Sequence, residues 1–218
     1  MPEIDRSRDV SQALDRLGAD ETMKARSDYL RGGINEGLLD RITGAMPSEH
    51  DVKLMKFHGI YQQDDRDLRE ERRRQRLEPA YQFMVRVRLP GGVCTPAQWL
   101  ALDQLARAHG GRTIRLTTRQ TFQFHWVLKG DLKRLISGLH DALLDTVAAC
   151  GDDTRGVMST ANASVSALHA EIAGLAKQVS DHVIPKTRAY HEIWYGEERV
   201  AGSAEEEPFY GRTYLPRK

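Results

Sequence analysis

Long apolar runs, cysteines and net charge are all scarce in this sequence, and each scarcity excludes a class of protein. No run approaches the roughly 18 apolar residues of a membrane span, and the first residues, MPEIDRSRDV, lack the apolar stretch of a secretion signal. The two cysteines, Cys94 and Cys150, stand too far apart for a C-x-x-C pair, which argues against a disulfide framework or a self-contained metal site. A formal net charge of +1 provides no bulk attraction to nucleic acid. We expect a soluble, cytoplasmic protein with no membrane partner.

The chain has 218 residues, enough for one large domain or two small ones. We expect a helical and extended N-terminal arm over residues 1–78, a mixed core over 79–160 and a helix-strand region over 161–218. Within the arm, from Asp9 to Leu30, apolar residues such as Val10 and Leu14 recur loosely at helical spacing. Short helices of this kind have little core of their own, so the arm is expected to need a partner surface.

The segment from Asp64 to Glu78 is densely charged but carries no net charge, since it holds six acidic residues and six arginines. Pairs such as Glu70 with Arg74 place the acid four residues before the base, the favourable order on an exposed helix. A stripe that binds phosphates should not neutralise itself. A solvated, self-paired helix is therefore favoured over a nucleic-acid patch.

Two adjacent segments predict a strand followed by a helix. Apolar and polar residues alternate from Gln82 to Leu89, which is typical of a strand with one buried face. In the next segment Thr95 is a candidate N-cap, Pro96 stands at the first helical position and Gln98 stands three residues after the cap. The helix should end near Gly110.

The segment IRLTTRQTFQFHW, from Ile114 to Trp126, alternates again. One face carries Arg115, Thr117, Arg119, Thr121, Gln123 and His125. The other face is the one expected to pack on helices, and it carries Ile114, Leu116, Thr118, Gln120, Phe122, Phe124 and Trp126. At about 3.3 Å per residue the segment would span roughly 43 Å, longer than the strands of small domains. We therefore expect a bend or break near Thr118 to Thr121.

The order of elements indicates the fold class. A second amphipathic helix is expected from Asp131 to about Leu143, and a further strand within residues 146–160. The order strand, helix, strand, strand, helix, strand predicts an α+β fold, a ferredoxin-like antiparallel sheet with helices on one face. Another helix over about 164–182 and a strand over 188–195 should follow.

The polar residues of the predicted strands gather four guanidiniums on one sheet face. The arginines are Arg86, Arg88, Arg115 and Arg119, with Thr117, Gln123 and His125 between them. Guanidiniums in this arrangement repel one another, and their planar forks suit carboxylates or phosphates. The face therefore indicates a polyanionic ligand with spread-out acidic groups. The alternative is that these arginines face water or pair with acidic residues elsewhere in the chain.

Four segments carry a resemblance to a known family. They are FHGIYQQDDRDLREERRRQRLEPAYQFMVRVRLPGG from Phe57, IRLTTRQTFQFH from Ile114, TRAYHEIW from Thr187 and TYLPRK from Thr213. Together they resemble the N-terminal half of the haemoprotein (beta) subunit of assimilatory NADPH-dependent sulfite reductases, within the nitrite/sulfite reductase family. The likeness extends from about Asp28 to Lys218. One difference is Thr118, which stands where many members have an asparagine.

The resemblance implies an oxidoreductase of sulfur assimilation that reduces sulfite to sulfide at sirohaem coupled to a [4Fe-4S] cluster. Sirohaem is rimmed with carboxylates and would be the polyanion that the arginines bind. The residues implied to bind it are Arg115, Thr117, Arg119, Gln123 and His125. Those implied to be catalytic, on the face where sulfite binds iron, are Arg86, Arg155 and Lys218. The four cluster cysteines belong to a pattern that this sequence lacks, so no metal ligand is expected in it.

The resemblance also implies partners. The N-terminal arm would dock on the flavoprotein (alpha) subunit that delivers electrons, residues 79–160 would form a ferredoxin-like half-domain, and residues 161–218 would begin the sirohaem-binding domain. The second half of the same subunit would cover the cofactor, so the isolated chain is expected to be inactive and to hold little cofactor. Two alternatives are a portion of a nitrite reductase and, less favoured, a ferredoxin-like module that binds single-stranded nucleic acid.

Overall fold

The computed structural model of the chain describes residues 19–27, 30–150, 155–160, 162–184, 192–195 and 198–202. The helices are α1 (Ala19–Ala25), α2 (Ile34–Leu39), α3 (Glu49–Phe57), α4 (Arg69–Arg74), α5 (Pro96–His109), α6 (Leu132–Asp141) and α7 (Ala167–Val183). The strands are β1 (Ile60–Asp64), β2 (Tyr81–Arg86), β3 (Ile114–Leu116), β4 (Phe122–Val127), β5 (Glu192–Tyr195) and β6 (Glu198–Gly202). Within these residues, no helix combines the length and the apolarity needed to cross a membrane.

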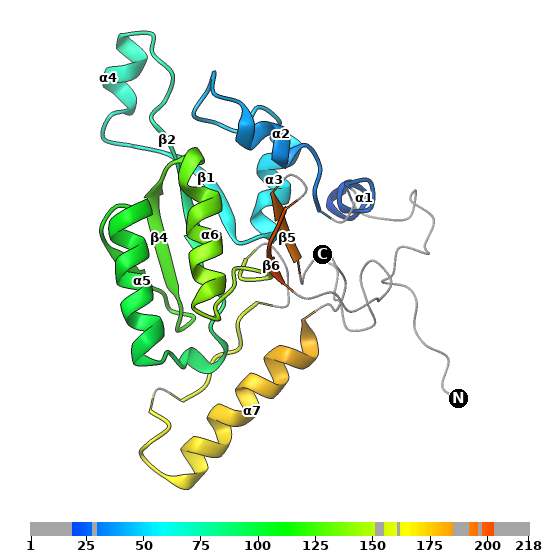
Figure 1. The fold of residues 1–218 in the computed structure, drawn as a ribbon, viewed down its shortest axis with the longest axis vertical. Coiled ribbons are helices and arrows are strands. Elements are labelled where there is room, and N and C mark those ends of the chain that lie inside the picture. Colours follow the sequence, from blue (N-terminus) through cyan, green and yellow to red (C-terminus); the bar gives the residue numbers. More distant parts are fainter. Residues whose placement is uncertain are drawn as a thin grey trace.

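The central feature is a four-stranded antiparallel sheet in the order β1-β2-β4-β3. Helices α5 and α6 lie together across one of its faces (Figure 1). This arrangement confirms the predicted α+β sheet with helices on one face. The predicted break is also confirmed, because β3 ends at Leu116 and β4 begins at Phe122. We call the face of the sheet away from α5 and α6 the open face.

One strand of the sheet differs from the prediction. Among the described residues from 146 to 160 there is no strand, and just before them Asp145 makes a single antiparallel bridge with Arg88. The outer position beside β2 is taken by β1 from upstream, whose Ile60 pairs with Val85. The sequence of β1, IYQQD, alternates too weakly to reveal a strand. A separate hairpin of β5 and β6 lies against α6, and β5 confirms part of the strand predicted over 188–195.

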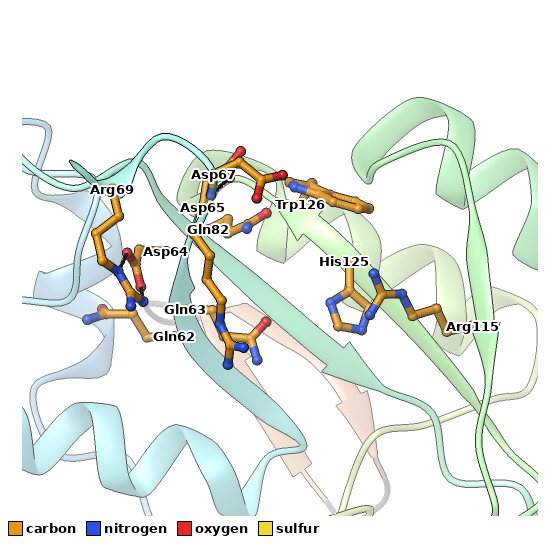
Figure 2. Close-up of a pocket in the computed structure, with 11 residues that line it drawn as sticks. Gln62, Gln63, Asp64, Asp65, Asp67, Arg69, Gln82, Arg115, His125 and Trp126 are labelled. Carbon is orange, nitrogen blue, oxygen red and sulfur yellow. Dashed lines mark hydrogen bonds and ion pairs between the residues drawn. The ribbon is translucent and has the colours of Figure 1, made fainter. Parts of the chain in front are cut away.

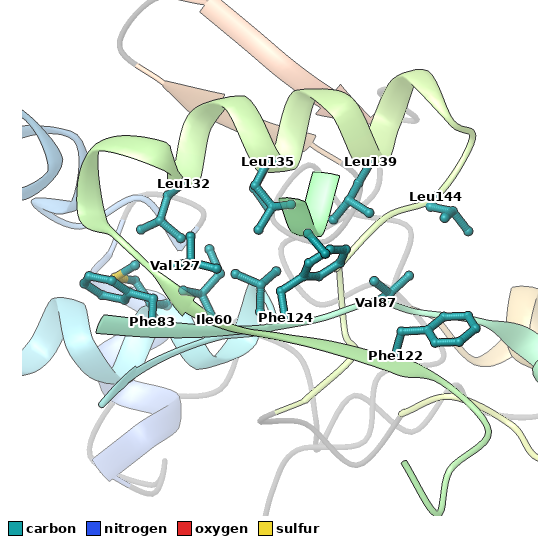
Figure 3. Close-up of a cluster of buried hydrophobic side chains, with 14 of the residues drawn as sticks. Ile60, Phe83, Val87, Phe122, Phe124, Val127, Leu132, Leu135, Leu139 and Leu144 are labelled. Atoms are coloured by element: carbon teal, nitrogen blue, oxygen red, sulfur yellow. The ribbon is translucent and has the colours of Figure 1, made fainter. Parts of the chain in front are cut away.

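Alternation along β2 and β4 builds the main core. Phe83 and Val85 on β2 and Phe124 on β4 are fully buried. The apolar stripe of α6 packs over them and consists of Leu132, Leu135, Ile136 and Leu139 (Figure 3). Burying each side chain of this size contributes about 1.5–3 kcal/mol. This burial holds the helices on one face and leaves the polar residues of both strands on the other.

Helix α5 begins and ends where the sequence predicts. Thr95 Oγ1 accepts a hydrogen bond from the Gln98 backbone N–H at 3.2 Å, and Gln98 Oε1 accepts one from the Thr95 backbone N–H at 3.0 Å. This capping box satisfies two N–H groups that would otherwise lack partners at the helix start. Pro96 occupies the first turn, and the helix ends at His109, directly before Gly110.

Strand β4 contains a bulge that the alternating pattern does not predict. The register with β2 shifts between Phe83, which pairs with Val127, and Val85, which pairs with Phe124. Within the bulge, Trp126 has a φ of 55°, in the left-handed region. The expectation that Trp126 packs in the core is therefore wrong, because its side chain is 44% exposed and Val127 is buried instead.

The helices α2 and α3, which precede the sheet, pack on the body of the protein. Leu38 of α2 and Met55 of α3 belong to the main buried cluster. Leu54 and Phe57 of α3 form a second buried cluster with Ile184, the residue that follows α7. The described helices α2 and α3 are thus stabilised by contacts within the chain.

Helix α4 is exposed and pairs its charges within its own segment, as predicted. The Arg69 guanidinium donates to both carboxylate oxygens of Asp64, at 2.7 and 2.6 Å. Arg73 lies 4.0 Å from the Glu70 carboxylate. Arg74 donates to the backbone carbonyl of Glu70 at 3.3 Å rather than to its carboxylate. Self-pairing is confirmed, although the partners differ from those that the spacing suggested.

A nearly buried arginine ties α7 to the sheet. Arg88, just beyond β2, has a side chain that is only 9% exposed. Its Nη2 donates to the Ser180 carbonyl at 3.1 Å and to the Ser180 hydroxyl at 2.7 Å. The guanidinium also lies 3.5 Å from the Asp181 carboxylate and 3.8 Å from that of Asp145. The placement of Arg88 among the ligand-binding guanidiniums is therefore wrong, because acids of this chain already neutralise it.

Replacing Leu135 with alanine should lower the free energy of unfolding by about 2–5 kcal/mol, because this side chain is fully buried between α6 and the sheet. The control is Leu100→Ala on α5, where the leucine is 61% exposed and the expected loss is below about 0.5 kcal/mol. Urea unfolding followed by circular dichroism measures both. Equal losses in the two variants would contradict this assignment of the core.

Replacing Arg88 with methionine should loosen α7, because two carboxylates and the Ser180 carbonyl lose their shared donor. Amide hydrogen exchange in α7 should become faster, while exchange in β2 and β4 stays nearly unchanged. Arg134→Met is the matched control, since Arg134 on α6 is 71% exposed and pairs with Asp131 over 3.6 Å. Unchanged exchange in α7 would show that Arg88 does not anchor it.

Candidate functional site

Antiparallel pairing brings three of the predicted site residues into one row on the open face. Gln123 on β4 pairs with Arg115 on β3 and with Arg86 on β2. Residues that pair across an antiparallel sheet point to the same side. Because the neighbours of Gln123, Phe122 and Phe124, are buried under the helices, the row Arg115–Gln123–Arg86 lies on the opposite face.

The central amide of the row lies between Arg86 and His125. With its oxygen turned toward Arg86, Gln123 accepts hydrogen bonds from Nη2 at 2.5 Å and from Nε at 2.9 Å. The other end of the amide faces His125 Nε2, at 3.4 Å. Gln123 thereby orients the Arg86 guanidinium along the open face and fixes its position relative to the imidazole.

His125 stands beside the row and is half-buried. Burial lowers its pKa, and the positive charges of Arg115 and Arg86 lower it further. The imidazole is therefore neutral at pH 7, with one donor and one acceptor nitrogen. A neutral ring adds hydrogen-bonding capacity to the face without adding to the repulsion between the guanidiniums.

The Tyr61 hydroxyl on β1 is influenced by the charges of both Arg86 and Arg155, which indicates that the two arginines lie in the same region. Burial raises the pKa of the Tyr61 phenol, and the electrostatic interaction and the hydrogen bond with the Cys150 side chain raise it further. The charges of Arg86 and Arg155 both act in the opposite direction on this hydroxyl. The phenol remains protonated at neutral pH, and two of the predicted catalytic residues influence one group. Sequence reasoning missed Tyr61 because it missed β1.

A hollow of about 570 Å³ lies next to the row (Figure 2). Its lining residues are Gln62, Gln63, Asp64, Asp65, Arg66, Asp67, Arg69, Gln82, Arg115, His125 and Trp126. Figure 2 shows Arg115 and His125 together on one side, and Asp64 with Arg69 on the other. The volume lies within the range of small-molecule sites, about 300–1,000 Å³.

The two sides of the hollow differ in charge. On one side, the hydrogen bonds from Arg69 hold the pKa of the Asp64 carboxyl below its usual range, so this pair is already neutralised. Asp65 and Asp67 lie in the loop that follows, where Asp65 accepts from the Asp67 backbone N–H at 2.9 Å. An anionic ligand is therefore favoured on the opposite side, next to Arg115.

One polar atom in the hollow has no partner. Gln82 Oε1 is buried and accepts no hydrogen bond from any described residue. A buried acceptor in this condition costs free energy, so a bound group that carries a hydrogen-bond donor would be favoured here. Gln82 is therefore a second contact point, on the strand adjacent to His125.

The remaining predicted residues lie elsewhere. Thr117 and Arg119 lie in the turn between β3 and β4, where Thr117 Oγ1 accepts from the backbone N–H groups of Arg119 at 3.2 Å and of Thr121 at 3.4 Å. Arg119 is exposed in this turn. Thr121, expected on the polar face, is buried. Lys218 lies outside the described residues.

The alternating pattern did not predict two features of the site. Trp126 lines the hollow only because the bulge turns it away from the core, and Gln62 and Gln63 line it only because β1 joins the sheet. A weak signal for β1 was the polar run that directly follows the apolar Ile60. No local signal indicated the bulge.

The residues present fit a carboxylate-rimmed tetrapyrrole on the basic side of the open face. Arg86 and Arg115 can each hold a carboxylate through two parallel N–H groups, and His125 and Gln82 add neutral hydrogen-bonding groups. Within the described parts of the chain, no group of three or more His, Cys, Asp or Glu side chains is arranged to hold a metal ion. These residues therefore offer contacts to an anion rather than a set of metal ligands.

Several known proteins are similar to this chain. Residues 74–142 match the family of the nitrite/sulfite reductase ferredoxin-like half domain. The chain is 70% identical over 218 residues to the sulfite reductase (NADPH) hemoprotein beta-component of Nitrosomonas europaea, covering 100% of this chain and 38% of that protein. The protein of the same name from Methylocella silvestris is 69% identical over 214 residues, covering 98% of this chain and 37% of that protein.

A solved structure shares the fold. The NirA protein of Mycobacterium tuberculosis matches with a TM-score of 0.55 and 25% sequence identity, over 69% of this chain and 28% of that one. The chain thus spans little more than a third of the length of the relatives that it matches. Over its whole length it is similar to part of the sulfite reductase haemoprotein beta component, and residues 74–142 match the nitrite/sulfite reductase ferredoxin-like half domain.

Proposed function

We propose that this chain is the N-terminal part of a haemoprotein that reduces sulfite to sulfide, and that its open face binds sirohaem. The observation that carries the proposal is the row Arg115–Gln123–Arg86 with the neutral His125 beside it. Among the described residues, neither arginine of the row forms an ion pair with an acid, in contrast to Arg88. Two guanidiniums on one half-covered face favour a ligand that brings its own carboxylates.

Arg86 and Arg155 would attract the substrate. Both act on the Tyr61 hydroxyl, which supports a common region of positive potential on the open face. In a site that excludes water, such cations stabilise the negative charge of an oxyanion far more than they do in solution. Lys218 would donate protons as oxygen leaves as water, since burial and neighbouring cations can lower a lysine pKa.

The redox chemistry would come from outside the described residues. When bound, sirohaem coupled to a [4Fe-4S] cluster would pass to the substrate the six electrons that an external donor delivers. The cluster thiolates would belong to the second half of the subunit, because Cys94 and Cys150 cannot provide four ligands. The role of this chain is therefore to bind and orient the cofactor and the anion.

A flavoprotein (alpha) component would deliver the electrons from NADPH in the cytoplasm. The word beta-component in the names of the relatives implies a second component. The N-terminal region is the proposed docking surface. Although α2 and α3 pack on the body of the protein, Leu39 at the end of α2 and Ile42 after it remain exposed and offer apolar contacts.

Complementation tests the proposal. The chain is purified alone, and also after coexpression with the part of the Nitrosomonas europaea beta-component that it does not cover. Alone it should neither reduce sulfite nor retain appreciable cofactor, whereas the pair should show sirohaem absorbance and produce sulfide with a reduced dye as donor. Arg86→Gln should lower kcat of the pair by about 10²–10³-fold, as for the loss of one oxyanion-stabilising donor.

The matched control is Arg107→Gln, an exposed arginine on α5 that pairs with Asp103 at 2.8 Å, far from the open face in the fold. It should leave kcat unchanged. A pair without sirohaem, or equal effects of the two substitutions, would refute the proposed function. Nitrite in the same assay tests the alternative substrate, and a higher kcat/KM for nitrite would favour a nitrite reductase.

The pH dependence of the free energy of unfolding should show that His125 is neutral in the folded chain. Because its folded-state pKa lies below the ordinary value of about 6.5, the unfolded state binds a proton first as the pH falls. The neutral His125 imidazole therefore contributes fully to stability above pH ~6.5, and this contribution is lost as the pH falls toward the folded-state pKa. In His125→Gln this acid-dependent loss should be absent.

Urea unfolding at pH ~7.5 and ~5.5 measures the difference between the wild type and the variant. His140→Gln, at an exposed position on α6, serves as the control for the loss of any histidine. If the free energy of unfolding decreases equally in the wild type and in His125→Gln between the two pH values, the folded-state pKa of His125 is not lowered.

A further inference from the structure

We propose that Trp126 is a positioning residue that holds the Arg115 guanidinium and the His125 ring in place for an anionic ligand. The inference relies on the proposed function for the identity of that ligand. The arrangement of the three side chains stands on the geometry of β3 and β4 alone. Trp126 would act through its two neighbours rather than on the reacting atoms.

The backbone around Trp126 is built to bring its ring out of the core. Its φ of 55° is unfavourable for a residue with a side chain, and the bulge that requires it also returns Val127 to the core. Gly111 provides the space for the ring, since a Cβ at that position would lie 2.3 Å from Trp126 Cε3. The Gly111 N–H donates to the His125 carbonyl at 2.8 Å, which ties the two segments together.

The ring contacts both polar residues of the basic side. Arg115 Cζ lies 5.6 Å from the centroid of the Trp126 ring, within the range of a cation–π interaction. The His125 ring centroid lies 6.2 Å from it, with the planes tilted by 60°. Figure 2 shows the three side chains around the same side of the hollow.

Packing alone does not account for this tryptophan. Its side chain is 44% exposed, so much of its apolar area stays in water, whereas Phe124 is fully buried. Arg115 is itself exposed, on the three-residue edge strand β3. A long side chain at such a position loses rotamer freedom when it binds a ligand. A ring that already restrains the guanidinium reduces that loss.

The ring also shapes the electrostatics around His125. The charged groups that face this imidazole are Arg115 on β3, Arg86 on β2 and, across the hollow, Asp64, Asp65, Arg66, Asp67 and Arg69. Without the Trp126 ring, water would reach His125 and Arg115 could move away from it. Both changes would raise the pKa of His125 toward its ordinary value.

Nuclear magnetic resonance titration of His125 in the 218-residue chain tests the inference without any cofactor. Trp126→Ala should raise the titration midpoint of His125, and Trp126→Phe should raise it less, because a phenyl face still attracts a cation, though more weakly. Both substitutions keep a side chain at the same strained position, so the backbone is matched. The shift that Trp126→Ala causes should be smaller in an Arg115→Gln background than in the wild-type background.

Equal shifts in the two backgrounds would overturn the inference, because Trp126 would then not act through Arg115. A wild-type midpoint in Trp126→Ala would also overturn it. If Trp126→Ala does not fold, Trp126→Phe with and without Arg115→Gln supplies the same comparison.

Sirohaem binding to the coexpressed pair provides the functional readout. Trp126→Ala should weaken binding by about two- to fivefold, the equivalent of one exposed cation–π contact, and Trp126→Phe should restore part of it. A wild-type pair that binds no sirohaem would refute the proposed function but leave the coupling of Trp126, Arg115 and His125 in place. Normal sirohaem binding by Trp126→Ala, together with independent titration shifts, would refute the positioning role alone.

Discussion

Antiparallel pairing of β2, β4 and β3 is the constraint on which the site depends. It places residues from three strands opposite one another, so that Arg115, Gln123 and Arg86 form one row. The helices then decide which side of the sheet that row occupies. Because α5 and α6 bury Phe83, Val85 and Phe124, the alternate residues of the same strands must point to the other face. A slip of one residue would bury the arginines and expose the core.

The positive charge of the open face depends on which arginines are not neutralised by acidic side chains of the same chain. Arg88 belongs to the same alternating pattern as Arg86, yet it lies beyond β2 and is neutralised by Asp145 and Asp181. Arg88 instead holds α7 against the sheet through its hydrogen bonds to Ser180. Arg86 has an amide partner instead, Gln123, which orients the guanidinium without cancelling its charge. The distinction between a structural and a ligand-binding arginine therefore rests on whether acids of the same chain can reach it.

Local signals predicted the elements that depend on local interactions. The capping box of Thr95 and Gln98 defines the start of α5 through contacts three residues apart, and the alternation in β2 follows from the burial of one face. The strand β1 was not predicted, because IYQQD acquires its extended structure from pairing with β2 rather than from its own pattern. Trp126 was assigned to the core for a related reason, since a bulge changes the period of two at a single residue.

The amino-acid order was sufficient for the α+β class, the two helices that cover the sheet, the break between β3 and β4, and the grouping of Arg86, Arg115, Gln123 and His125 on one face. These features follow from periodicity and capping, which act over a few residues. The tertiary structure alone decided that β1 completes the sheet, that Arg88 is taken by α7, and that Trp126 stands against Arg115 and His125. The first two depend on residues far apart in the chain, and the free energy of such contacts exists only once the chain has closed around them. The third depends on the bulge in β4, which forms only when β4 pairs with β2.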